Sequence, residues 1–201
     1  IPATLQTNFR IASMSKSFTA LAILKLRDEG KLQLTDPVAK HLPAFHKLRY
    51  PTSDSPSITI ENLLTMSAGF PEDNPWGDRQ LADSDDDLLR LLESGLSFSN
   101  TPGIEYEYSN LGFASLGKII SVVSGQPYQQ YIRDQILQPL RMNDARWEYQ
   151  EVAPEKLALG YRWEDNQWKK EALLGDGSYG AMGGLICSVE DFSKYMAFNI
   201  Q

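Results

Sequence analysis

The sequence of 201 residues has few of the residues that build disulfides, metal sites or nucleic-acid surfaces. Its single cysteine, Cys187, excludes an internal disulfide, and the apolar run around it predicts a buried core position. Its two histidines, His41 and His46, have no third ligand in register, so we expect loop histidines and no metal site. The excess of 26 acidic over 19 basic residues, a net charge of -7, argues against nucleic-acid binding.

The sequence also lacks a long apolar run and a phosphate-binding glycine loop. No apolar stretch approaches the roughly 20 residues that cross a membrane, and any export signal would precede Ile1. No Gly-x-x-x-x-Gly-Lys run occurs, and we expect no cofactor. The hydrophobic share of 42% over this length still predicts one globular domain with a sizeable core.

Ser13 and Lys16 lie three residues apart at the start of a segment that is apolar on nearly every side. Such a segment predicts a buried helix over about residues 14–29, ended by Gly30. Because residues three apart share a helix face, a deprotonated Lys16 could take the proton of a Ser13 nucleophile. The N–H groups at the helix N-terminus would favour negative charge on an attacked carbonyl.

Spacing alone does not single out this pair. A second Ser-x-x-Lys occurs at Ser115 and Lys118, inside a helix predicted over residues 111–124. Ser13 by itself also fits a simple helix N-cap, with Lys16 as a solvated residue of the first turn. The choice between these interpretations depends on other motifs.

Tyr108 and Asn110 form the only Tyr-x-Asn in the sequence, between a turn at residues 100–103 and the helix predicted at 111–124. Both side chains could point from this corner into a common cleft. The alternative is a tyrosine packed by its ring, with Asn110 as the N-cap of the next helix.

Further helices and strands are predicted from helix-capping residues and from the alternation of apolar and polar residues. We predict helices over residues 84–95 and 127–137, and strands over 157–163 and 167–173 about a turn at 164–166. Ser188 and Asp191 predict a capping box at the start of a last helix.

In this order, Ser13-Met-Ser-Lys16 and Tyr108-Ser-Asn110 resemble the motifs of the serine β-lactamase and penicillin-binding-protein family. The branch is that of class C β-lactamases, D-alanyl-D-alanine carboxypeptidases and family VIII esterases. Flanks at residues 30–43, 58–69 and 180–185 are also similar, so the resemblance spans most of the chain. It implies an α/β (α+β) fold of the β-lactamase/transpeptidase type, a helical region packed on a mixed sheet that is largely missing here.

The resemblance implies a serine hydrolase that forms an acyl-enzyme on an ester, amide or β-lactam carbonyl of a small-molecule or peptide substrate. It gives Ser13 the role of nucleophile, Lys16 and Tyr108 the proton transfers, and Asn110 the orientation of Lys16 and a contact with the substrate's amide. Which of Lys16 and Tyr108 is the base stays open. The alternative function is a non-catalytic ligand- or peptide-binding module. A periplasmic or secreted location rests on the resemblance alone.

The loop at residues 70–78 would border the mouth of such a site. There Trp76 is either a wall of the substrate site or a plug that fixes its own loop, and Glu72 and Asp73 would favour a substrate with a positive group. The family's third motif, a Lys-Thr-Gly or His-x-Gly-like triplet, would lie beyond Gln201. We therefore expect residues 1–201 to be an incomplete catalytic domain.

Overall fold

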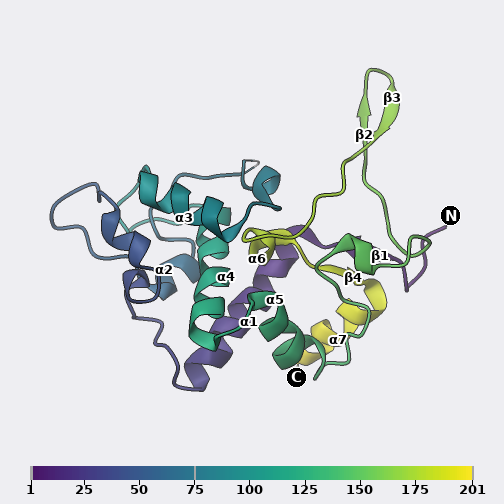
Figure 1. Ribbon diagram of the computed structural model, residues 1–201, viewed down its shortest axis with the longest axis horizontal. Coiled ribbons are helices and arrows are strands. Elements are labelled where there is room, and N and C mark those ends of the chain that lie inside the picture. The colour runs from purple at the N-terminus through teal and green to yellow at the C-terminus, as the bar shows by residue number, and fades with distance from the viewer. Residues whose placement is uncertain (1, 75, 201) are drawn as a thin grey trace.

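The computed structural model describes residues 2–74 and 76–200, and its longest elements are helices (Figure 1). The helices are α1 (Ser15–Asp28), α2 (Ile60–Leu64), α3 (Asp85–Ser94), α4 (Asn110–Ser124), α5 (Tyr128–Ile132), α6 (Gly180–Gly183) and α7 (Val189–Asn199). The strands are β1 (Asn8–Arg10), β2 (Tyr161–Glu164), β3 (Gln167–Lys170) and β4 (Ile186–Ser188). Short 3₁₀ turns lie at Ala12–Met14, Val38–Lys40, Pro43–Lys47, Gly77–Gln80 and Tyr149–Glu151.

Helices α1 and α4 pack on each other in the middle of the molecule. Helices α2 and α3 lie on one side of this pair, and β1, β4 and α7 lie on the other (Figure 1). Phe18, Ile23 and Leu26 of α1 have no exposed surface, so the prediction of a buried helix over residues 14–29 is confirmed. Burial of such side chains contributes about 1.5–3 kcal/mol each, which anchors α1 in the core.

Helix α4 agrees with the helix predicted over residues 111–124. Its N-cap is Ser109, whose Oγ accepts a hydrogen bond of 3.0 Å from the Gly112 N–H, and it ends at Gly125 in the left-handed conformation. Helix α6 approaches α4 closely at Gly117, where an added Cβ would lie 2.4 Å from the Cβ of Ala181. Glycine at this position is what lets the two helices meet.

Two small antiparallel sheets are described. In the first, β1 pairs with β4, and Phe9 lies opposite Cys187, which is buried as predicted. In the second, β2 pairs with β3, Trp163 lies opposite Trp168, and the hairpin projects from the body (Figure 1). These strands are shorter than the predicted 157–163 and 167–173, because the Ala158 N–H bonds to the Asn8 carbonyl of β1 instead of to the hairpin.

Other elements differ in detail from the sequence predictions. Helix α3 begins at the capping box of Ser84 and Asp87 and confirms the helix predicted over 84–95. The helix predicted over 127–137 is instead α5 followed by a π turn at Arg133–Leu137. Only half of the predicted capping box at α7 forms, since the Ser188 Oγ accepts from the Asp191 N–H while the Asp191 carboxylate accepts from the Asp144 N–H.

The contact between α4 and α6 predicts that alanine destabilises the protein at one glycine of α4 and is tolerated at another. Gly117→Ala should destabilise the protein by about 1–3 kcal/mol through overpacking, although alanine is the better helix former by about 1 kcal/mol. Gly112→Ala is the matched control, because its Cβ would meet its nearest neighbour at 3.5 Å, an ordinary contact. Urea unfolding measures both, and equal stability of the two variants would contradict the close packing.

Candidate active site

Ser13 lies in a 3₁₀ turn, Ala12–Met14, that joins β1 to α1. Ala12 has φ +48°, a left-handed conformation that is uncommon outside glycine and that bends the chain sharply here. Ser13 is exposed, while Ser15 and Lys16 that follow are buried. The predicted place of Ser13 at the helix N-terminus is therefore confirmed, although α1 itself begins two residues later.

Lys16 is buried, with 6% of its surface exposed, and its amine is surrounded by oxygen atoms. Its Nζ donates to Ser13 Oγ at 3.1 Å, to Asn110 Oδ1 at 2.7 Å and to the Met182 carbonyl at 2.8 Å. These partners come from the β1–α1 corner, α4 and α6, so the amine is fixed from three sides.

Tyr108 and Asn110 complete the group. The Tyr108 hydroxyl lies 2.6 Å from Ser13 Oγ, and its ring centroid lies 4.9 Å from Lys16 Nζ. Asn110 is fully buried, and its Nδ2 lies 3.5 Å from Asn74 Oδ1, which leaves Oδ1 facing Lys16. The fold thus brings together Ser13, Lys16, Tyr108 and Asn110. The alternative role of Asn110 as the N-cap is wrong, since Ser109 has that role.

The environment moves the pKa values of Lys16 and Tyr108 in opposite directions. Burial lowers the pKa of Lys16 to about 8, and the negative charges of Asp73 and Asp78 partly offset this. Burial raises the pKa of Tyr108 above its ordinary value of 10, while the hydrogen bond to Ser13 acts the other way. At neutral pH a neutral amine is therefore more accessible than a phenolate.

The second Ser-x-x-Lys pair is not brought together in this way. Ser115 is fully buried in α4, and its Oγ has no hydrogen-bond partner among the described residues. Lys118 instead forms an ion pair with Asp85 of α3. This contrast identifies Ser13 as the serine with a neighbouring amine.

The loop at residues 70–78 holds the N-terminus of α4. The Asp73 carboxylate accepts hydrogen bonds of 2.7 Å from the N–H groups of both Asn110 and Leu111. Gly77 touches Asn110 so closely that a Cβ there would lie 2.6 Å from the Asn110 Cβ. The loop therefore supports the residue that orients Lys16.

The three residues that the sequence predicts to bind substrate lie in this loop. Glu72 has an exposed side chain, and its backbone N–H donates to Glu107 Oε1 at 2.9 Å. Trp76 is 43% exposed and meets the ring of Tyr179 edge-on at 6.0 Å. Asp73 has the structural contacts described above. Substrate binding by Trp76, Glu72 and Asp73 stays a prediction.

Sequence reasoning did not find two contributors to the site. The Met182 carbonyl accepts a hydrogen bond from Lys16, and a backbone carbonyl leaves no side-chain signature, although residues 180–185 are similar to a flanking segment of the family. Asp78 raises the pKa of Lys16 through space, and although the loop at residues 70–78 is predicted to border the site, no motif singles out Asp78 within it.

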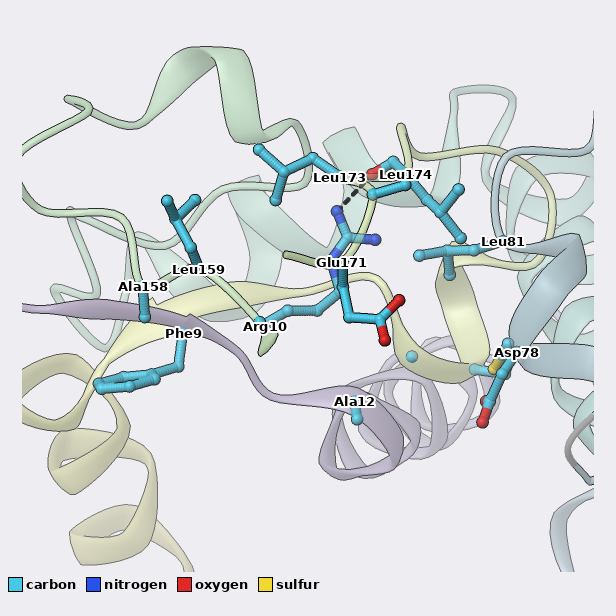
Figure 2. Close-up of a pocket in the computed structure, with 14 residues that line it drawn as sticks. Phe9, Arg10, Ala12, Asp78, Leu81, Ala158, Leu159, Glu171, Leu173 and Leu174 are labelled. Atoms are coloured by element: carbon cyan, nitrogen blue, oxygen red, sulfur yellow. Dashed lines mark hydrogen bonds between the residues drawn. The ribbon is translucent and has the colours of Figure 1, made fainter. Parts of the chain in front are cut away.

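A cavity of about 420 Å³ includes Ala12, the residue before Ser13, in its lining, while Ser13 itself is not part of that lining (Figure 2). Most of its lining is apolar: Phe9, Leu81, Ala158, Leu159, Leu173, Leu174 and Met182. Arg10 crosses it and donates to the Leu174 carbonyl at 2.6 Å, and the carboxylates of Asp78 and Glu171 add negative charge (Figure 2). The cavity can accept an apolar group, and it borders Ala12, the residue before Ser13.

Metal-ligating clusters and membrane-spanning helices are both absent from residues 2–74 and 76–200. Those residues contain no group of three or more His, Cys, Asp and Glu side chains arranged to hold a metal ion. Within the same ranges, no helix combines the length and hydrophobicity that crossing a membrane requires.

Comparisons with known proteins show the family and the type of fold. Residues 1–200 match the protein family described as Beta-lactamase. Protein flp of Staphylococcus aureus (strain MW2) is 35% identical over 205 residues, which cover 100% of this chain and 40% of that protein. The octameric penicillin-binding protein homologue from Pyrococcus abyssi has a TM-score of 0.83 at 32% identity, covering 100% of this chain and 46% of its own. A penicillin binding protein from Bacillus halodurans has a TM-score of 0.82 at 30% identity, covering 100% and 63%.

The fold is therefore of the β-lactamase/transpeptidase type, which confirms the expected fold class. The chain belongs to the beta-lactamase family, which includes penicillin-binding proteins. It spans about two fifths of the length of the curated relative it matches.

The capping role of Asp73 predicts a difference between two adjacent acids. Asp73→Ala should lower the free energy of unfolding by about 1–2 kcal/mol, because α4 loses the acceptor of two N–H groups. Glu72→Ala is the control and should stay within about 0.5 kcal/mol, as exposed substitutions do. Denaturant unfolding compares them. A loss confined to Glu72→Ala would contradict the assignment.

Proposed function

We propose that this protein is a serine hydrolase that works through an acyl-enzyme on Ser13. The observation that carries the proposal is the buried Lys16 amine, 3.1 Å from Ser13 Oγ and with its pKa lowered to about 8. With that pKa, about one amine in ten is neutral at pH 7, against about three in ten thousand for an ordinary lysine. A neutral amine at hydrogen-bond distance is what an unactivated serine needs as a base.

The proton path follows from the contacts. Ser13 Oγ attacks the carbonyl carbon, and its proton passes to Lys16 Nζ directly or by way of the Tyr108 hydroxyl, 2.6 Å away. The proton then returns to the leaving group, and water releases the acyl group from Ser13. Asn110 and the Met182 carbonyl hold the amine in place while its charge changes.

We propose an ester, amide or β-lactam carbonyl as the reacting group, in a small molecule or peptide. The mostly apolar cavity that borders Ala12, the residue before Ser13, supports a substrate with an apolar group. The relatives extend beyond the matched stretch, so the proposal concerns the intact natural protein.

Covalent labelling with a fluorophosphonate probe tests the nucleophile. The intact natural protein should gain one adduct on Ser13, and Ser13→Ala should lose it while keeping its melting temperature within a few degrees. Ser115→Ala is the matched control, since its serine also precedes a lysine by three residues but has no neighbouring amine. Absence of labelling in a folded protein would instead favour a ligand-binding module.

The pH dependence of labelling tests which group is the base. If Lys16 acts, the rate should rise about tenfold per pH unit at low pH and level off above about pH 8, because only the neutral amine accepts a proton. Tyr108→Phe should slow labelling but keep this midpoint. A rate that still rises at pH 10 would point to Tyr108, whose pKa lies above its ordinary value.

A further inference from the structure

Asp176 makes partly buried hydrogen bonds outside the group formed by Ser13, Lys16, Tyr108 and Asn110. Its Oδ2 accepts hydrogen bonds from the Tyr128 hydroxyl at 2.8 Å and from Gln129 Nε2 at 2.7 Å, both at the start of α5. Its backbone N–H donates to Glu148 Oε1 at 3.2 Å. Its Oδ1 is buried and has no hydrogen-bond partner among the described residues. An unpaired buried oxygen is costly, which suggests that its position has another use.

That oxygen fills the space beside two glycines. A Cβ at Gly180 would lie 1.8 Å from Asp176 Oδ1, and a Cβ at Gly184 would lie 2.2 Å from it. Gly180 is the first residue of α6, and Gly184 is the residue that follows its end. The carboxylate therefore packs against both ends of α6, at sites that only glycine leaves open.

Helix α6 in turn is bonded to α1 along its length. The Met182 carbonyl accepts from Lys16 Nζ at 2.8 Å, and the Ala181 carbonyl accepts from Thr19 Oγ1 at 2.7 Å. Just after α6, the Leu185 N–H donates to Ser15 Oγ at 3.1 Å. The position of α6 thus decides both the acceptor of Lys16 and how far water is excluded from its amine.

We propose that Asp176 is a positioning residue for the Ser13–Lys16 pair, which seats α6 so that the Met182 carbonyl and the packing around it keep the Lys16 amine buried and aimed at Ser13. The inference rests on the proposed function for its catalytic meaning. The pKa of Lys16 can nevertheless be measured without any turnover.

Few charged or titratable side chains face Asp176 or Lys16. Tyr128, Glu148 and Arg10 face Asp176, and burial raises the pKa of its carboxyl to about 6, so it is mostly ionised at pH 7. Tyr108, Asp73 and Asp78 face Lys16. Because burial is the largest cause of the low pKa of Lys16, hydration of its amine should outweigh the loss of one carbonyl acceptor and raise that pKa.

The experiment compares Asp176→Ala with wild type in the intact natural protein. The pKa of Lys16 is followed by NMR of ¹³Cε-labelled lysine, with the Lys16 signal assigned by its loss in Lys16→Arg. Fluorophosphonate labelling of Ser13 is followed from pH 6 to 10. We expect the pKa to rise by at least one pH unit and labelling at pH 7 to slow about tenfold, with most of the rate recovered at pH 10.

Two variants separate positioning from stability. Asp176→Asn keeps the shape beside Gly180 and Gly184 and should stay within about threefold of the wild-type rate. Asp191→Ala removes another buried carboxylate, the acceptor of the Asp144 N–H, and should lower the melting temperature without moving the pKa of Lys16. If Asp176→Ala does not fold, Tyr128→Phe should give a smaller rise in the same pKa.

An unchanged Lys16 pKa in folded Asp176→Ala, or in Tyr128→Phe if only that variant folds, would overturn the inference. A raised pKa in a protein that no probe labels would keep Asp176 as the residue that positions Lys16 and would reject the hydrolase.

Discussion

The burial of one lysine amine is the constraint on which the rest of the site depends. Removing a charged ammonium from water is costly unless it gains hydrogen bonds or gives up its proton. Lys16 gains hydrogen bonds to three oxygen acceptors, and it also loses its proton more readily, with a pKa near 8. Two of these acceptors, in Asn110 and Met182, lie 94 and 166 positions away in the sequence. The fold is what brings them to the amine.

Close approach of helices makes that convergence geometrically feasible. Gly117 lets α6 reach α4, Gly77 lets the 70–78 loop touch Asn110, and Gly180 and Gly184 make room for Asp176. At each of these glycines an added side chain would collide with atoms of another segment, so a small change in volume would displace a residue of the site. Tight packing of this kind favours one arrangement of the site over loosely collapsed ones.

The sequence predicted which side chains lie together better than it predicted the backbone contacts that hold them there. The sequence could predict that Ser13, Lys16, Tyr108 and Asn110 lie together, because each belongs to a recognisable motif. It could also predict α1 and α4, because their apolar residues mark them as helices. The contact of Met182 with Lys16 could not be predicted, because every residue has a backbone carbonyl. The hairpin strands were predicted too long because alternation does not tell which partner residues 157 and 158 will pair with. The assignment of Asn110 to the N-cap failed for a similar reason, since Ser109 is equally suited and only the structure chooses.

Asp73 links the stability of α4 to the pKa of Lys16. Its carboxylate fixes the first turn of α4, and hence Asn110, by accepting two backbone hydrogen bonds. Its negative charge also raises the pKa of Lys16 against the effect of burial, as does that of Asp78. A stronger base is a better proton acceptor once neutral, but fewer amines are neutral at a given pH. The pKa near 8 reflects both influences on Lys16, because burial makes the amine less basic while the nearby carboxylates partly restore its basicity. The loop that holds the helix in place therefore also sets how readily Lys16 gives up its proton.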